Sequence, residues 1–170
     1  MDIEKTLLHA TVCYLIEGKQ VLLGMKTDKI GKGCWNGYGG GIEPKETQLR
    51  AAKRELKEEC GVRTFQKHLK KVAIIDFHNT KSDGTTFVCR VHFYITEIWR
   101  GIPKKSKEME TPTWFSFKKL PIEKMMPADK QFLPLILSGK KIIAKAKYGP
   151  FQKELLEPME IKEVDSLPEN

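Results

Sequence analysis

Runs of apolar residues that alternate with polar ones at the start of the chain predict a β-hairpin. Residues 7–16 and residues 20–25 are both strand-like. Glu17, Gly18 and Lys19 lie between them and form a tight turn. Two strand-like runs joined by so short a polar connection are typical of antiparallel partners.

The periodicity is lost in residues 27–41, which are rich in glycine and lysine and therefore predict a loop. Glycine adopts backbone conformations that are closed to other residues. We expect the loop to use this freedom at Gly37, Gly39, Gly40 and Gly41.

A helical pattern replaces the loop after Pro44 and predicts a helix over residues 47–60. Gly61 follows the last periodic position and is expected to end the helix as a C-terminal cap. The apolar positions fall on one stripe, which is made of Leu49, Ala52, Leu56 and Cys60.

The second half of the chain alternates strand-like and helical segments. Strands are predicted at 72–79, 86–99, 113–117, 142–147 and 155–164, a turn at 81–84 and a helix at 129–137. Strands interleaved with two helices favour a mixed sheet covered by helices. We expect one domain over residues 1–165 and a loose tail over residues 166–170.

Composition and charge narrow the possible partners. The four cysteines (Cys13, Cys34, Cys60 and Cys89) form no C-x-x-C pair, and no apolar run is long enough for a membrane span, so we expect a reduced, cytoplasmic protein. The formal net charge of +8 favours polyanions, either nucleic acid or phosphate-rich small molecules. Lysines scattered over the surface for solubility are an equal alternative, and no arginine-rich arm or zinc finger favours nucleic acid.

Three acids are crowded on the predicted helix despite this positive balance. Glu55, Glu58 and Glu59 stand at i, i+3 and i+4, so their carboxylates converge on one side. Like charges at this spacing destabilise a helix, and Arg54 cannot neutralise all three. A solvated helix face is the plain alternative. Oxygen ligands that leave room for phosphates favour a Mg²⁺ or Mn²⁺ site.

The same residues resemble the Nudix box. Gly40, Glu46 and the run Arg54 to Val62 (RELKEECGV) match its fixed positions. The resemblance implies a Nudix fold, an α/β/α sandwich with a mixed β-sheet, and Mg²⁺-dependent hydrolysis of nucleoside diphosphate derivatives. It extends over residues 7–150 to MutT-type enzymes that remove oxidised purine nucleoside triphosphates.

By position, the MutT-type resemblance implies roles for particular residues. The catalytic residues implied are Glu55, Glu58, Glu59 and Arg54. Glu108 is implied as a metal ligand, but it can also be interpreted as one more surface charge. Phe77 is implied at the base, although such a residue more often belongs to a core. The metal ligands implied are the Gly39 carbonyl, Glu55, Glu58, Glu59 and Glu108, and the substrate-binding residues are Thr11, Lys26, Asn36, Tyr38, Gly39, Gly40, Phe77, Met126 and Asp129.

One segment departs from the MutT-type pattern at the purine pocket. Residues 126–129 read Met-Pro-Ala-Asp, which keeps one acid but lacks a second acid and an aromatic plate. We therefore expect altered base selectivity but retained pyrophosphohydrolysis. The expected substrate is an oxidised purine nucleoside triphosphate such as 8-oxo-dGTP, and the expected assembly is a monomer or a homodimer. The alternatives are hydrolysis of a dinucleoside polyphosphate, nucleotide sugar or capped RNA, and a non-catalytic nucleotide- or RNA-binding protein.

Overall fold

The computed structural model describes residues 6–169, which form two α-helices and a nine-stranded mixed sheet. Three short 3₁₀ helices join these elements: η1 (Gln66–His68), η2 (Ile122–Lys124) and η3 (Pro150–Gln152). The helices are α1 (Gln48–Cys60) and α2 (Asp129–Leu137); the strands are β1 (His9–Glu17), β2 (Gln20–Met25), β3 (Trp35–Asn36), β4 (Tyr38–Gly41), β5 (Lys70–Thr80), β6 (Thr86–Thr96), β7 (Thr113–Ser116), β8 (Lys141–Lys147) and β9 (Glu160–Val164).

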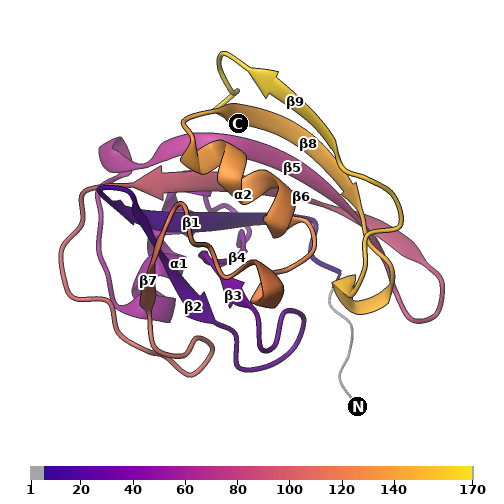
Figure 1. The fold of residues 1–170 in the computed structure, drawn as a ribbon, viewed down its shortest axis with the longest axis horizontal. Coiled ribbons are helices and arrows are strands. Elements are labelled where there is room, and N and C mark those ends of the chain that lie inside the picture. The colour runs from indigo at the N-terminus through magenta and orange to yellow at the C-terminus, as the bar shows by residue number, and fades with distance from the viewer. Residues whose placement is uncertain (1–5, 170) are drawn as a thin grey trace.

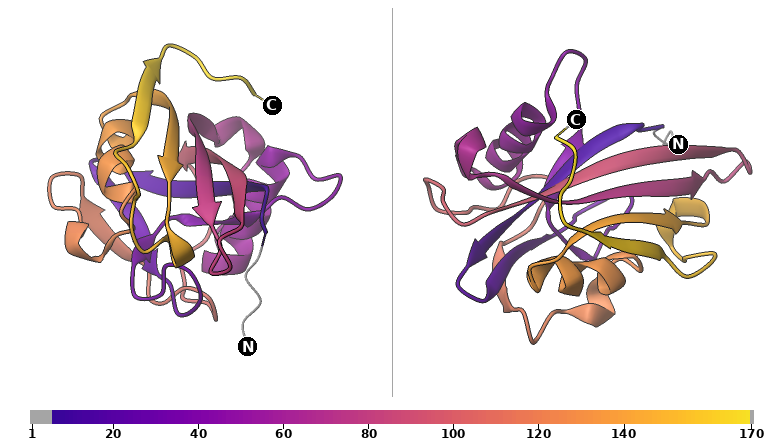
Figure 2. Two further views of the ribbon diagram at one scale, coloured as in Figure 1. Left: turned by 90° about the vertical axis from the view of Figure 1, so that its right-hand side faces the viewer. Right: turned by 90° about the horizontal axis from the view of Figure 1, so that it is seen from above.

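The strands lie in the order β3-β2-β1-β6-β5-β8-β9, with β4 paired to β1 and β7 paired to β2 (Figure 1). The β1–β6 and β5–β8 pairs are parallel and the other pairs are antiparallel. Seen from above, α1 and α2 lie on opposite sides of the sheet (Figure 2). The α/β/α layering and the mixed sheet confirm the predicted fold class.

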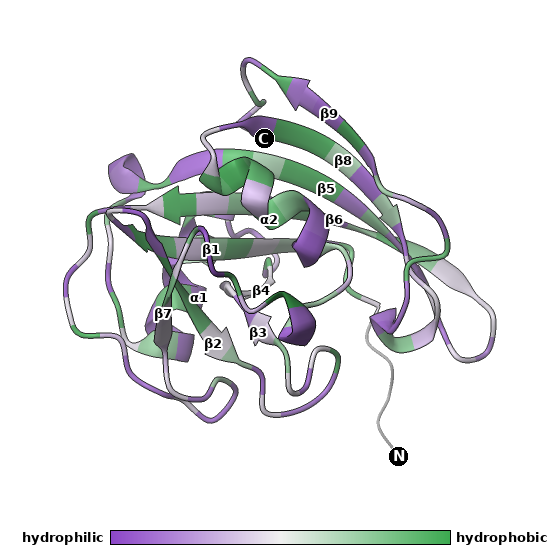
Figure 3. Ribbon diagram, viewed as in Figure 1, coloured by the Kyte–Doolittle hydropathy of each residue, from purple (hydrophilic) through white to green (hydrophobic). Residues whose placement is uncertain are grey.

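Each helix covers its own hydrophobic cluster, because successive strand residues point to opposite faces of the sheet. Ala52, Leu56 and Cys60 of α1 pack on Cys13 and Leu15 of β1. On the other face, Phe132, Leu133 and Ile136 of α2 belong to a larger cluster that includes Tyr14 and Phe93. The strands and α2 are correspondingly rich in hydrophobic residues, and the connecting loops are mostly hydrophilic (Figure 3).

Local signals place α1 where the sequence predicts it. The Thr47 hydroxyl accepts a hydrogen bond from the Arg50 amide at 3.2 Å and so caps the first turn. Gly61 ends the helix in the left-handed conformation, with φ of 74°, and its amide donates to the Lys57 carbonyl. The hairpin of β1 and β2, the strand β6 and the helix α2 are also confirmed.

The prediction of a loop over residues 27–41 is wrong in its second half, where β3 and β4 form. β4 pairs with β1 through Val12 and Gly39, among others. The glycines of β4 do not use positive φ angles; they allow close approach instead. A Cβ on Gly39 would lie 1.9 Å from the Thr11 carbonyl oxygen, so a side chain at this position would prevent the pairing.

The predicted domain (residues 1–165) and the predicted tail (residues 166–170) each extend beyond the described residues. Residues 1–5 and Asn170 lie outside the described residues. Within the tail, the Pro168 carbonyl accepts a hydrogen bond of 2.9 Å from the Lys71 ammonium group. None of the helices in the described part of the chain is long and apolar enough to cross a membrane.

Candidate functional site

Two of the three acids of α1, Glu55 and Glu59, contact β4, and the three differ in exposure. Glu59 is 6% exposed and accepts a hydrogen bond of 2.7 Å from the Gly39 amide. Glu55 is 8% exposed and packs so close to Gly40 that a Cβ there would lie 2.5 Å from its Oε1. The Glu58 side chain remains 57% exposed. The helix therefore presents two buried carboxylates and one solvated carboxylate at the edge of β4.

Arg54 ties this cluster to the loop before α1. Its guanidinium group donates two hydrogen bonds to Glu46, at 2.8 and 2.9 Å, and one of 2.9 Å to the Gly41 carbonyl. The same group contacts Glu55 at 2.8 Å and Glu58 at 3.3 Å. A forked donor of this kind fixes the orientation of its acceptors. Arg54 therefore positions two of the five predicted metal ligands, Glu55 and Glu58.

Burial and mutual repulsion disfavour the charged forms of the two buried acids in the cluster. The pKa of Glu59 is raised to about 8, chiefly by burial and next by repulsion from Glu55, and the hydrogen bond from Gly39 opposes this rise. The pKa of Glu55 is also raised, chiefly by burial, despite the contact with Arg54. Glu108 contributes to both shifts, so this exposed side chain lies within electrostatic range of the cluster.

Oxygen donors held close together in a partly desolvated place fit a divalent cation. As the side chains lie, no group of three or more His, Cys, Asp or Glu residues among residues 6–169 has metal-site geometry. Hydrogen bonds explain this arrangement, because Arg54 holds Glu55 and Glu58 while the Gly39 amide holds Glu59. The donor set fits a divalent cation, and the present hydrogen bonds engage one oxygen of each of the three carboxylates.

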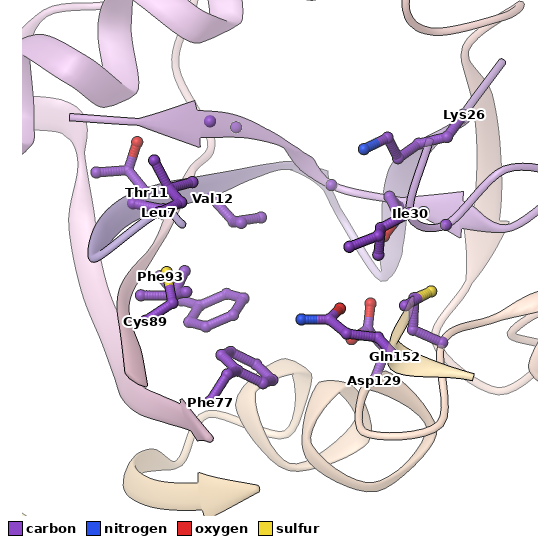
Figure 4. A pocket seen from close by; sticks show the side chains of 18 of the residues that line it. Leu7, Thr11, Val12, Lys26, Ile30, Phe77, Cys89, Phe93, Asp129 and Gln152 are labelled. Atoms are coloured by element: carbon purple, nitrogen blue, oxygen red, sulfur yellow. The ribbon is translucent and has the colours of Figure 1, made fainter. Parts of the chain in front are cut away.

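A cavity of about 240 Å³ opens beside the cluster, with Glu59, Gly39 and Gly40 in its wall. Figure 4 shows Thr11 and Lys26 on one side of this space and Phe77, Asp129 and Gln152 on the other. The remaining lining residues are Leu7, Ala10, Val12, Tyr14, Ile30, Gly31, Asn36, Gly37, Cys89, Val91, Phe93, Met109, Met126 and Tyr148. The cavity therefore joins an acidic end to an aromatic and polar end.

The aromatic end is built from β5 and the segment after β8. Phe77 is 8% exposed and stacks on Tyr148, with ring centroids 6.0 Å apart and planes inclined by 10°. Asp129, the first residue of α2, lies in the same wall, and burial raises its pKa to about 7. Across the cavity, the buried Thr11 hydroxyl has no hydrogen-bond partner among the described residues. These groups can contact the face and the polar edge of a flat ring.

Most of the sequence-predicted site residues meet at this cavity. Lys26 and Met126 line it, and Asn36 does so while its amide donates to the Cys34 carbonyl at 3.0 Å. Tyr38 does not: it is fully buried in the cluster under α1, because its strand turns that side chain to the α1 face. The structure therefore places Tyr38 in the core and not in the cavity wall where a substrate-binding residue would lie.

Some lining residues had no sequence signal. Gln152 and Tyr148 come from the irregular segment after β8, and Ile30 comes from the loop before β3. None of these stands in a periodic segment or a spaced motif. Only the pairing of β8 with β5, which brings Tyr148 and Gln152 beside Phe77, places the segment at the cavity.

Comparison with known families and proteins gives consistent matches. The model of the NUDIX domain matches residues 6–136. A mouse protein (Mus musculus) named oxidized purine nucleoside triphosphate hydrolase is 34% identical over 156 residues, which cover 92% of this chain and 95% of the mouse protein. A zebrafish protein (Danio rerio) of the same name is 36% identical over 138 residues, covering 81% of this chain and 85% of the relative.

A solved structure supports the same fold. The crystal structure of the mutator MutT protein from Bacillus halodurans superimposes with a TM-score of 0.77. The match covers 91% of this chain and 97% of that chain, at 24% sequence identity. At that identity the likeness concerns the fold alone.

Proposed function

Because the chain belongs to the Nudix hydrolase family, we propose that it hydrolyses oxidised purine nucleoside triphosphates, such as 8-oxo-dGTP, to the nucleoside monophosphate and pyrophosphate. The observation that carries the proposal is the position of Glu59, which belongs to the acidic cluster and also lines the cavity that ends at Phe77 and Asp129. A triphosphate bound at the acids would thus extend its base into the aromatic end. The names of the mouse and zebrafish relatives support this substrate class.

Mg²⁺, with Mn²⁺ as a substitute, is the cation that we propose for the acidic cluster. Glu55, Glu58 and Glu59 would hold it, together with Glu108 and the Gly39 carbonyl. When bound, the ion supplies positive charge that offsets the triphosphate and favours ionisation of the attacking water. Hard oxygen donors of this kind select such cations over zinc.

The protein's own groups divide the remaining work. Whichever of Glu55 and Glu108 is not ligating the metal at that moment accepts the proton of the water that attacks the β-phosphorus, and the bond from that phosphorus to the bridging oxygen of the α-phosphate breaks. Arg54 keeps Glu55 and Glu58 oriented. Lys26, at the cavity wall, contacts the anionic substrate.

The other end of the cavity binds the nucleoside. Phe77 offers a ring for stacking, and the polarizable Met126 sulfur packs against the base where the MutT-type pattern has an aromatic plate. Asn36 and Asp129 offer polar atoms to the purine edge, and the Thr11 hydroxyl offers another. With a single acid at this end, we propose a selectivity for oxidised bases that differs from the MutT-type pattern.

The test is pyrophosphate release with and without Mg²⁺ by wild type, Glu59→Gln and the control Glu97→Gln, whose side chain is exposed. We expect Glu59→Gln to lower kcat by at least about 10²-fold, because a neutral amide replaces a charged ligand in the cluster. Glu97→Gln should match wild type, and chelation should abolish turnover. Near-normal activity of Glu59→Gln with a normal melting temperature would contradict the assignment.

The substrate is decided by a panel. 8-oxo-dGTP, 2-hydroxy-dATP, dGTP and dATP are assayed beside a dinucleoside polyphosphate, a nucleotide sugar and a capped RNA. We expect the highest kcat/KM among the oxidised purine triphosphates. Preference for another member of the panel would transfer the proposal to that substrate class.

A further inference from the structure

Gln152 stands in an unusual backbone conformation at the end of η3. Phe151 and Gln152 have φ angles of 59° and 54°, in the left-handed region that side chains other than glycine rarely occupy. Two successive residues of this kind persist only where their surroundings hold them. The Gln152 side chain is partly buried and lines the cavity next to Asp129, on the side that also holds Phe77 (Figure 4).

A neighbouring asparagine fixes the direction of the Gln152 amide. Asn79 is 6% exposed, and its Nδ2 donates to the Phe77 carbonyl at 3.2 Å. A carbonyl only accepts, so this bond sets which end of the Asn79 amide is nitrogen. The Asn79 Oδ1 therefore points the other way and accepts a hydrogen bond of 2.8 Å from Gln152 Nε2. This contact uses one of the two Gln152 N–H donors and directs the amide, and it leaves the Oε1 acceptor without a hydrogen-bond partner among residues 6–169.

The position of that acceptor matches the edge of a base. Phe77 lies on the same side of the cavity as Gln152, and the same residue provides the carbonyl that anchors Asn79, so ring and acceptor are both fixed to one strand, β5. A purine stacked on Phe77 would turn its edge toward the wall that contains Asp129 and Gln152. N–H groups on that edge are donors and need acceptors when they leave water.

We propose that Gln152, held by Asn79, is a specificity-determining residue whose Oε1 accepts a hydrogen bond from an N–H group on the edge of the purine base. The inference rests on the proposed function, because it requires a purine nucleotide in the cavity. Asn79 is then a positioning residue, which acts on the substrate only through Gln152. A site built to hydrogen-bond a substrate group rejects analogues that lack it.

The first test is Gln152→Met, which keeps the length of the side chain and removes its hydrogen bonds. We expect kcat/KM for the preferred oxidised purine triphosphate to fall about tenfold, through a higher KM with little change in kcat, because the lost contact lies at the base and not at the phosphates. The matched control is Gln66→Met in η1, whose side chain is exposed, and it should behave as wild type. A Gln152→Met enzyme within twofold of wild type would overturn the inference, as would a loss confined to kcat.

A double-mutant cycle separates base recognition from a structural effect. Asn79→Ala should raise KM in the wild-type background and add no further change in the Gln152→Met background. Equal effects of Asn79→Ala in both backgrounds would show that Asn79 does not act through Gln152. Calorimetric binding of the nucleoside monophosphate product provides the same comparison without turnover, and should weaken about tenfold in Gln152→Met.

The outcomes keep the two proposals apart. If wild type hydrolyses purine triphosphates but Gln152→Met is unaffected, only the role of Gln152 fails. If wild type hydrolyses none of them and binds no purine nucleotide, the proposed function fails and the role of Gln152 fails with it.

Discussion

At the scale of single residues, Asp129 carries a carboxyl group that is desolvated by burial. Burial alone raises its pKa from 3.8 to about 7. The titratable neighbours that sense its charge are Tyr14, Cys34 and Tyr148, all of which are neutral when Asp129 ionises. No positively charged group in that set compensates the carboxylate, so its ionisation lowers the free energy of unfolding.

The consequence for stability has a definite sign. Between pH 4 and pH 7 the folded protein keeps a proton on Asp129 that the unfolded chain has lost, so the free energy of unfolding falls as pH rises through this window. Asp129→Asn removes the titration. We expect the variant to match wild type near pH 4 and to exceed it by about 2 kcal/mol at pH 8, since water in the cavity reduces the full effect of the shift.

Denaturant unfolding at pH 4, 6 and 8 measures this difference. Asp28→Asn, which replaces an exposed aspartate with the same change of side chain, serves as the matched control. A constant difference between Asp129→Asn and wild type at all three pH values would show that the carboxyl does not titrate as the geometry indicates.

At the scale of elements, the contact between β4 and α1 determines where the acids stand. Gly40 lies against Glu55, and a Cβ at this glycine would approach the carboxylate within 2.5 to 3.0 Å at three atoms. The neighbouring Gly41 meets only the flexible end of Leu7. The strand therefore has one position at which an added methyl group would act on the acidic cluster directly.

Gly40→Ala is expected to displace Glu55 and to lower kcat by about 10- to 100-fold, because displacements near 1 Å at a reacting centre are enough for such losses. The free energy of unfolding should fall by about 1 to 3 kcal/mol, as for other overpacked sites. Gly41→Ala should cost less activity, since the Leu7 side chain can move. Turnover and melting temperature measured on both variants test this expectation. Equal activity of Gly40→Ala and Gly41→Ala would contradict a specific displacement of Glu55.

The sequence predicts those elements whose signals are local. α1 carries an apolar stripe and is flanked by a capping threonine and a terminal glycine, and the β1–β2 hairpin has two strand-like runs around a short turn. α2 has no side-chain cap, and its apolar residues alone indicate it. β3 and β4 carry no such pattern, because their pairing with β2 and β1 depends on contacts outside the segment. The glycines that looked like loop residues are there for close approach between strands.

The residues of the candidate site also differ in whether a local sequence signal indicates them. The spacing of Glu55, Glu58 and Glu59 is a helical signal, so the sequence alone indicates the acidic cluster. Phe77 and Asp129 became candidates only through resemblance to a family, since an aromatic residue in a strand and an acid in the first turn of a helix are ordinary features. Gln152 had no signal at all, because its role depends on a brace from Asn79, 73 positions away.

At the scale of the whole molecule, the fold gathers one cavity from distant parts of the chain. β1, β4 and α1 form its acidic end, and β5, α2 and η3 form its aromatic and polar end. The parallel pairing of β8 with β5 is what brings η3 to this position. The two ends can therefore be varied separately, which allows base selectivity to change while the acidic cluster is kept.

The net charge of +8 acts over the whole surface and bears on substrate capture. A triphosphate approaches an acidic cluster that repels it, so the surrounding positive charge is the source of long-range attraction. We expect kcat/KM to fall several-fold between about 0.03 and 0.3 M NaCl, because added salt shortens the range of this attraction. The kcat at saturating substrate should change little, since capture no longer limits the rate. Holding free Mg²⁺ constant controls for metal binding, and a kcat/KM that does not respond to salt would mean that the lysines serve solubility alone.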